Sequence, residues 1–270
     1  MSDDRKKMIK QAFDMVASGY DHPSLPFFPE TAQRLLTMLD LQPGARILDV
    51  CTGTGAVALR AAEKYPDCEI TGIDLSVGML NQARQKAVQH KIENIKFLEM
   101  DLDKLAFPPA HFNVATCSFG LFFLPDMQAA LKNIIAVVKP RGQIVISGFI
   151  DEAFQPFTDL FLQRYQSYGK EVQPLSWLRM SNEQKINELF SAVGINKITY
   201  QHVPLGHKIN SPQQWWDVVW NAGFRGMLNQ LTKEQCTEFE ADHRQEIAAV
   251  CATGNDWLNT GVIIASARLD

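Results

Sequence analysis

The sequence predicts an α/β fold in which helices cover both faces of a mostly parallel sheet. Apolar runs of strand length alternate with helical patterns from residue 46 to residue 149, the order typical of such a sheet. A glycine-containing turn follows the first strand, and the 270 residues, 46% of them hydrophobic, can bury one large core. The expected strands cover 46–51, 69–74, 95–100, 112–117 and 143–148; the helices between them lie near 56–64, after Ser76, and from Asp126 to Pro140.

The segments on either side of this core carry mostly helical patterns. An amphipathic helix is expected over 5–19 and a second helix near 29–39. Beyond residue 149 the expected elements are a helix near 154–168, a helix that begins at a Ser181–Gln184 capping box and ends at Gly194, and strands near 196–203 and 262–267.

Two further capping-box patterns predict a helical insertion before the last strand. They begin at Ser211 and Thr232, and the insertion covers about 205–255. We therefore expect one domain over 1–270, with an N-terminal helical lid at 1–45 and a cofactor-binding core at 46–149. The C-terminal part, 150–270, carries the insertion as a substrate cap.

Composition and charge narrow the class of protein. The formal net charge is −4, and Lys and Arg never form a run longer than Arg5-Lys6-Lys7, so nucleic acid is disfavoured as a substrate. No apolar run approaches about 18 residues and no signal-like segment follows the N-terminal charges, which predicts a cytoplasmic protein without integral membrane association. Five scattered cysteines indicate neither a disulfide framework nor a zinc site, and no metal is expected.

The turn after the first strand predicts a nucleotide-binding loop. In Leu48-Asp-Val-Cys-Thr-Gly-Thr-Gly-Ala-Val-Ala58 the chain leaves a strand and enters a helix through two glycines, which allow close approach of the backbone to a ligand. The same residues satisfy the dinucleotide pattern G-x-G-x-x-A, with Asp74 about 20 residues later. The loop alone therefore leaves a nicotinamide dinucleotide as an alternative.

Two carboxylates favour a cationic cofactor. Asp49 lies in the strand before the loop, where it would repel a pyrophosphate, and Asp101 follows the third strand. S-adenosylmethionine carries an ammonium and a sulfonium, which carboxylates, carbonyls and aromatic faces stabilise. In this interpretation Asp74 accepts from the ribose hydroxyls and Asp101 from the adenine amino group.

Several motifs in their joint order resemble the class I methyltransferases. They are L-D-V-C-T-G-T-G at 48–55, I-D-L-S-V-G-M-L at 73–80, M-D-L at 100–102, F-N-V-A-T-C-S-F-G-L-F-F-L-P-D at 112–126 and V-V-K-P-R-G at 137–142. The N-terminal residues 13–21 match the F-D-x-V-A-x-x-Y-D opening of the ubiquinone/menaquinone-biosynthesis type and the broad type 11 group. The resemblance covers about 12–149; Cys51 departs from it, because most relatives carry Gly or Ala there.

The resemblance implies a Rossmann-like seven-stranded sheet of order 3-2-1-4-5-7-6, with strand seven antiparallel. The cofactor, S-adenosyl-L-methionine, would lie across the carboxyl ends of strands one and four. The implied contacts are Tyr20, Asp49, Cys51, Gly53, Thr54 and Gly55 toward the methionine end, Asp74, Leu75 and Met79 at the ribose and adenine, Asp101 and Leu102 at the base, and Ser118 and Phe119 facing the methyl group.

No residue in the sequence stands out as a catalytic base. His22, His202 and His207 are weak candidates, as is His243, and each such residue is more often structural. The aromatic residues of the insertion are mostly expected in the core, with one or two facing an acceptor pocket: Trp215, Trp216, Trp220, Phe224 and, beside them, Met227.

The function predicted from the sequence is methyl transfer from S-adenosylmethionine to a small, apolar or aromatic acceptor by in-line displacement. A NAD(P)-dependent oxidoreductase and a non-catalytic S-adenosylmethionine-binding protein remain the alternatives. The acceptor, the methylated atom, the general base and the oligomeric state stay open.

Overall fold

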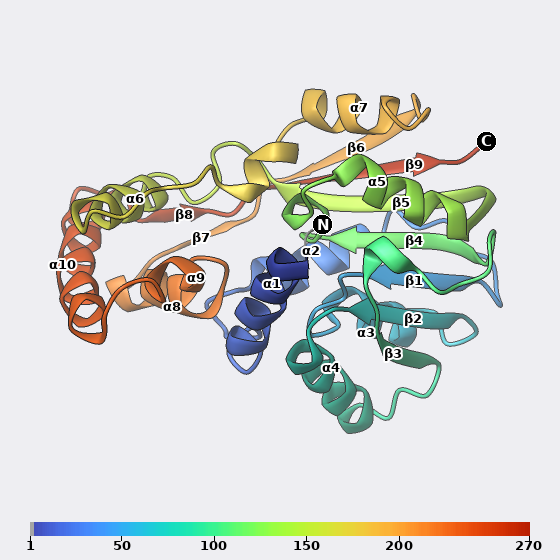
Figure 1. Ribbon diagram of the computed structural model, residues 1–270, viewed down its shortest axis with the longest axis horizontal. Coiled ribbons are helices and arrows are strands. Elements are labelled where there is room, and N and C mark those ends of the chain that lie inside the picture. Colours follow the sequence, from blue (N-terminus) through green and yellow to red (C-terminus); the bar gives the residue numbers. More distant parts are fainter. Residues whose placement is uncertain (1–2) are drawn as a thin grey trace.

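The computed structural model describes residues 3–270 and contains the expected seven-stranded sheet (Figure 1). The strand order is β3-β2-β1-β4-β5-β9-β6. All neighbours pair in parallel except β9, which is antiparallel to both β5 and β6. Because β9 is the seventh strand of this sheet along the chain, the predicted order 3-2-1-4-5-7-6 with an antiparallel last strand is confirmed. The strands are β1 (Arg46–Val50), β2 (Glu69–Asp74), β3 (Ile95–Glu99), β4 (Phe112–Ser118), β5 (Val138–Phe149), β6 (Ile198–Val203) and β9 (Val262–Arg268).

Helices flank this sheet, and the expected caps begin two of them. Ser76 Oγ accepts from the Met79 N–H at 3.0 Å, and Asp126 Oδ1 accepts from the Ala129 N–H at 2.8 Å. Each cap satisfies a backbone donor that the first turn leaves unpaired. The flanking helices are α2 (Phe27–Leu35), α3 (Ala56–Lys64), α4 (Val77–Gln89), α5 (Met127–Val137) and α7 (Glu183–Ser191), with α2 packed on α3 and α5 on α7.

Two local expectations are wrong. Helix α5 ends at Val137 and the chain enters β5 at once, so Pro140 lies inside the strand rather than at the end of the helix. Asn182, not Ser181, caps α7: its side chain accepts from the Lys185 N–H, while the Ser181 hydroxyl donates to Asp151.

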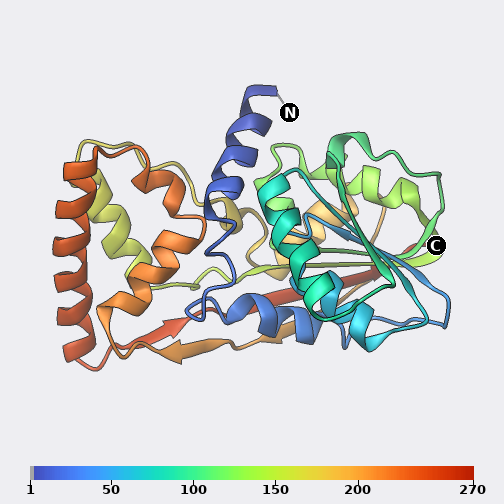
Figure 2. The ribbon, with the colours of Figure 1, turned by 90° about the horizontal axis from the view of Figure 1, so that it is seen from below.

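The insertion is helical as predicted, and it forms a lobe beside the sheet with helix α6 (Phe157–Ser167) (Figures 1 and 2). We call residues 206–259 together with α6 the cap. Thr232 and Gln235 form the predicted capping box, whereas Ser211 occupies the N-cap position without a side-chain hydrogen bond. A two-stranded antiparallel ribbon, which was not expected, pairs the two ends of the insertion where it leaves and re-enters the core. The elements of the insertion are β7 (Gly206–Lys208), α8 (Pro212–Asn221), α9 (Arg225–Leu228), α10 (Lys233–Ala252) and β8 (Trp257–Asn259).

Helix α1 (Asp3–Val16) lies between the core and the cap (Figure 2). It contacts α4 on the core side and α9 on the cap side. Within the part of the chain that the structure describes, no helix is both long and apolar enough to cross a lipid bilayer.

Candidate functional site

A cavity opens at the carboxyl ends of β1, β2, β3 and β4, where the sequence places its nucleotide-binding residues. Its empty space, part of it open to solvent, is about 1100 Å³. All the residues expected at the cofactor line it except Gly55: Tyr20, Asp49, Cys51, Gly53, Thr54, Asp74, Leu75, Met79, Asp101, Leu102, Ser118 and Phe119.

The loop after β1 is held in the tight conformation that its glycines permit. Gly53 and Gly55 have φ values of 55° and 84°, in the region that favours glycine. A Cβ at Gly53 would meet no protein atom within 4 Å, so this side of the loop leaves space for a ligand. A Cβ at Gly55 would instead lie 3.0 Å from Leu59 and 3.2 Å from Ala83. Gly55 therefore serves close packing of the loop and helices rather than the cavity.

Asp49 brings a buried carboxylate to the cavity wall. Its two oxygens accept hydrogen bonds from the hydroxyls of Thr52 and Thr116, each at 2.6 Å. Burial has the larger effect on the pKa of Asp49 and raises it to about 6, although the hydrogen bonds lower it. A nearby cation would restore the charged form, whereas a pyrophosphate would be repelled. This geometry disfavours the dinucleotide alternative.

Asp74, at the end of β2, has lone pairs left for a ligand. One oxygen accepts from the Gly53 N–H at 2.8 Å and the other from the Ser76 N–H at 2.9 Å. Burial raises the pKa of Asp74, and a third backbone hydrogen bond, from Leu75, joins the other two in lowering it. Because a carboxylate can accept about four hydrogen bonds, Asp74 still has acceptor capacity for a hydroxyl donor such as that of a ribose.

Helix α1 covers the end of the cavity at β3. Lys6 forms an ion pair with Asp101 and a second with Asp103 at 2.8 Å. On the neighbouring turns, Asp14 accepts from the Ser76 hydroxyl at 2.6 Å and from the Gly78 N–H at 2.8 Å. Neither Lys6 nor Asp14 stands out in the sequence, because their partners lie 60 to 100 residues away along the chain.

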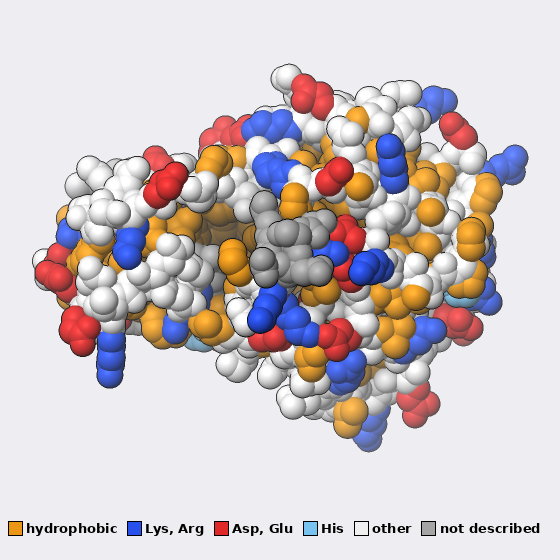
Figure 3. Space-filling view, in the orientation of Figure 1, with side chains coloured by type: hydrophobic (Ala, Val, Ile, Leu, Met, Phe, Trp, Pro, Cys, Tyr) orange, Lys and Arg blue, Asp and Glu red, His pale blue; other side chains and the backbone are white. Residues whose placement is uncertain are grey.

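A second, apolar space adjoins the cavity, and we call it the aromatic recess. Phe13, Tyr20, Phe28, Phe119 and Phe123 line both spaces and so form their common wall. The other residues of the recess come from the core and the cap: Phe27, Phe122, Phe149, Phe154, Trp177, Val218, Ala222, Gly223 and Phe224. In Figure 3, a hollow with hydrophobic side chains lies between the cap and the region of α1.

The insertion aromatics divide between core and recess. Phe224 lines the recess, while Trp215 is fully buried and Trp216 packs against Trp220 and Phe239. Trp220 is 39% exposed, with the guanidinium of Arg225 stacked 3.1 Å from its ring centroid. The expectation that most of these residues serve the core fits the structure.

The structure does not bring the candidate histidines to the cavity. His22 accepts from the Ser24 N–H at 3.2 Å and lines a separate surface groove near α3. His202 lies on β6, exposed, 2.7 Å from Glu183. His207 lies on β7, where burial lowers its pKa, and its Nδ1 has no hydrogen-bond partner among the described residues.

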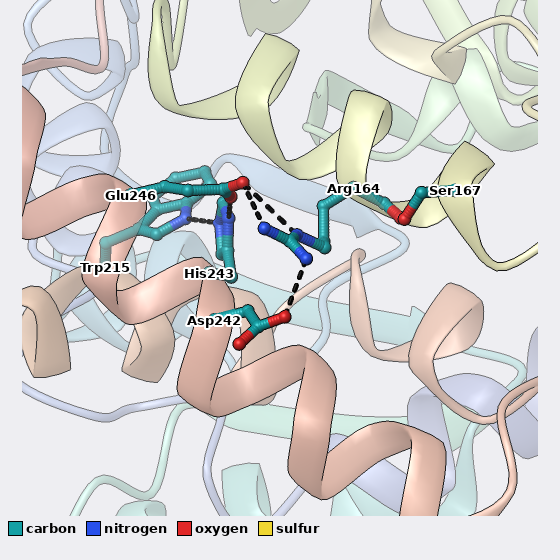
Figure 4. Close-up of polar contacts among 6 residues, drawn as sticks. All are labelled: Arg164, Ser167, Trp215, Asp242, His243 and Glu246. Carbon is teal, nitrogen blue, oxygen red and sulfur yellow. Dashed lines mark hydrogen bonds and ion pairs between the residues drawn. The ribbon is translucent and has the colours of Figure 1, made fainter.

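His243 has a structural role inside the cap (Figure 4). Its Nε2 accepts from the Trp215 indole at 2.8 Å and its Nδ1 lies 3.1 Å from Glu246. Arg164 of α6 contacts Glu246 and also Asp242 at 2.7 Å. Burial lowers the pKa of His243, so the neutral imidazole joins α8 to α10 and, through Arg164, to α6.

The geometry of sheet, loop and acidic cavity agrees with comparisons to known proteins. The family model described as a methyltransferase domain matches residues 47–142. Aklanonic acid methyltransferase DauC of Streptomyces sp. strain C5 is 34% identical over 58% of this chain and 70% of its own. A demethylmenaquinone methyltransferase of Listeria welshimeri is 26% identical over 74% of this chain and 92% of its own.

The fold recurs in phosphoethanolamine N-methyltransferase 2 of Haemonchus contortus, solved in complex with S-adenosylhomocysteine. The TM-score is 0.54 at 16% identity, over 89% of this chain and 52% of that one. The chain belongs to the class I S-adenosylmethionine-dependent methyltransferases. It is an enzyme that uses S-adenosylmethionine to methylate a small molecule.

The residues present fit that cofactor. The remaining acceptor capacity of Asp74 suits the ribose hydroxyls, and buried Asp49 provides negative charge for the cationic end. The open side of Gly53 leaves room for a ligand against the backbone. Cys51 lines the cavity with φ 54°, and its thiol forms a hydrogen bond with Cys117.

Proposed function

We propose that this enzyme methylates a small, planar, apolar acceptor that binds in the aromatic recess beside the cofactor cavity. The observation that carries the proposal is the common wall, because five aromatic residues line both spaces. A ligand in the cavity and a ligand in the recess would therefore meet at these side chains. The names of the relatives, with aklanonic acid and demethylmenaquinone as substrates, support a small organic acceptor.

We assign the cavity residues to parts of the cofactor. Asp74 binds the ribose hydroxyls and Asp101 the adenine amino group, with Leu75, Met79 and Leu102 packed around the base. Asp49, Cys51, Gly53 and Thr54 surround the methionine end, and Tyr20, Ser118 and Phe119 face the methyl group. The cofactor supplies a methyl group already activated by its sulfonium.

The side chains at the methyl end align the acceptor rather than take its proton. Burial, with the charges of Asp74 and Asp21, raises the pKa of Tyr20, so its phenol stays protonated. A hydrogen bond with the Cys117 thiol, together with burial, raises the pKa of Cys51, which also stays neutral. In-line methyl transfer then depends on alignment and on the exclusion of water by the aromatic wall.

Further assignments concern the subgroup of the family, the cellular location and the roles of the parts of the chain. We assign the chain to the type 11 group and to the cytoplasm, with a small molecule rather than nucleic acid as its partner. Residues 1–45 act as a lid, 46–149 as the cofactor-binding core, and the insertion as the cap over the acceptor. The ion pairs of Lys6 with Asp101 and Asp103 support the lid.

The proposal is tested by following the methyl group. The protein is incubated with a metabolite extract and S-adenosylmethionine labelled in its methyl carbon, and the labelled product is identified by mass spectrometry. We expect the label in a neutral aromatic compound that moves into organic solvent, and no label with Asp74→Ala. A phosphorylated, strongly charged or macromolecular product would contradict the apolar acceptor.

A further inference from the structure

Trp177 places a hydrogen-bond donor without a partner in the wall of the aromatic recess. Its Nε1 atom is buried, and no described residue accepts its proton. Buried donors almost always have a partner, so one that lacks a partner beside a ligand pocket calls for an explanation. Trp177 belongs to the short helix η3 (Ser176–Met180), outside residues 47–142 that the methyltransferase family model matches.

The rings around this indole provide no side-chain acceptor. Trp177 lies edge-on to Phe149, Phe154 and Phe224, with centroid separations of 6.3, 5.6 and 5.8 Å. These phenyl groups line the recess with it. The partner of the indole N–H must therefore come from the backbone after a small shift, from water, or from a molecule bound in the recess.

The position of Trp177 distinguishes it from the other polar group of the recess. Tyr20 lines both the recess and the cofactor cavity, whereas Trp177 lines the recess alone. An acceptor that reaches the cofactor past Tyr20 would meet Trp177 with a part that lies outside the common wall. The recess thus combines apolar rings with one donor that does not line the cofactor cavity.

We infer that Trp177 determines specificity by donating its indole hydrogen to an oxygen on the part of the acceptor that lies in the recess outside the common wall. The acceptor is then a flat aromatic molecule that carries two oxygens or other polar atoms, one near the transferred methyl and one on the part that contacts Trp177. This inference rests on the proposed function of the recess. A site built to hydrogen-bond a ligand oxygen discriminates against an analogue that lacks it, because the buried donor stays unpaired.

Two probes of nearly the same shape test this role. One is a naphthol with an acetyl group on its far ring; the other carries an isopropenyl group there and has no oxygen at that end. Their affinities for the complex with S-adenosylhomocysteine are measured by calorimetry. We expect the acetyl probe to bind about tenfold more tightly to the parent protein and equally tightly to Trp177→Phe, as one lost hydrogen bond predicts. Trp257→Phe, which alters a tryptophan that is 56% exposed, should retain the tenfold preference.

The remaining outcomes separate this inference from the proposed function. If Trp177→Phe keeps the preference, or weakens both probes equally, the indole N–H does not read the ligand and the inference is wrong. The same holds if the parent protein binds both probes equally, as it would if water satisfied the donor. If neither probe binds while S-adenosylhomocysteine does, the recess is not an aromatic acceptor site, and the proposed function fails together with the inference.

Discussion

Replacement of Asp74 by Ala should weaken binding of the cofactor more than any other single change in the cavity. Each Asp74 oxygen already accepts one backbone N–H, and in the proposed site the carboxylate also accepts from the two ribose hydroxyls. Two hydrogen bonds to a charged group contribute about 1.5–3 kcal/mol each. Their loss, about 3–6 kcal/mol, corresponds to an affinity lower by roughly a hundredfold to ten-thousandfold.

Asp101→Ala is the matched comparison. Its side chain is 20% exposed and already forms an ion pair with Lys6, so a bond to the adenine amino group competes with both water and an ammonium. We expect a loss of about tenfold, near the lower limit for one charge-assisted bond. Calorimetric titration with S-adenosylhomocysteine measures both variants, and thermal unfolding checks that they fold. Parent-like affinity in a folded Asp74→Ala protein, or a larger loss in Asp101→Ala, would refute the assignment of the ribose site.

Three further experiments test other parts of the site. Because the pKa of Asp49 is about 6, affinity for S-adenosylmethionine should fall as the pH falls through 6, by up to about tenfold per pH unit. Asp49→Asn should bind the cofactor more weakly, with an affinity that does not depend on pH in this range. A pH-independent affinity of the parent protein would exclude Asp49 as the partner of the cationic end. Amide exchange across 5–28 should slow when S-adenosylhomocysteine binds, and unchanged protection would contradict a closing lid. Phe224→Leu should raise the KM for the acceptor identified from the extract several-fold and leave cofactor affinity unchanged, whereas Trp220→Leu should change neither quantity. Equal effects of the two substitutions would assign both residues to the packing of the cap.

The core could be predicted from the sequence because its signals are local. A strand, a glycine turn and a capped helix each occupy fewer than about 20 consecutive residues, as in the run from β1 through Gly53 to α3. In a parallel sheet, the carboxyl ends of neighbouring strands meet at one edge. Asp49 and Asp74 could therefore be placed together before any side-chain geometry was known.

The rest depends on contacts between distant segments. Whether Ser181 or Asn182 caps α7 was decided by Asp151, which binds the Ser181 hydroxyl from the loop after β5. The ribbon β7–β8 has three residues in each strand, too few to produce a period in the sequence. The aromatic recess likewise combines side chains from Phe13 to Phe224, and helical spacing alone cannot say which ring of α8 faces core or ligand.

The two ends of the site are built by different means, and this bears on how acceptor specificity can change. The cofactor end depends on backbone groups and short side chains at strand ends, such as the Gly53 N–H and Asp74, which adjacent hydrogen bonds fix in place. The proposed acceptor end, the aromatic recess, depends on large side chains from α1, α2, η3 and the cap, with Trp177 and Phe224 among them. Because the second group contributes few contacts to the first, replacements in the recess can alter its shape at little cost to cofactor binding. The exceptions are the five residues of the common wall, which line both spaces: Phe13, Tyr20, Phe28, Phe119 and Phe123. Variation in acceptor should therefore be greatest at recess residues that do not line the cofactor cavity, such as Trp177 and Phe224.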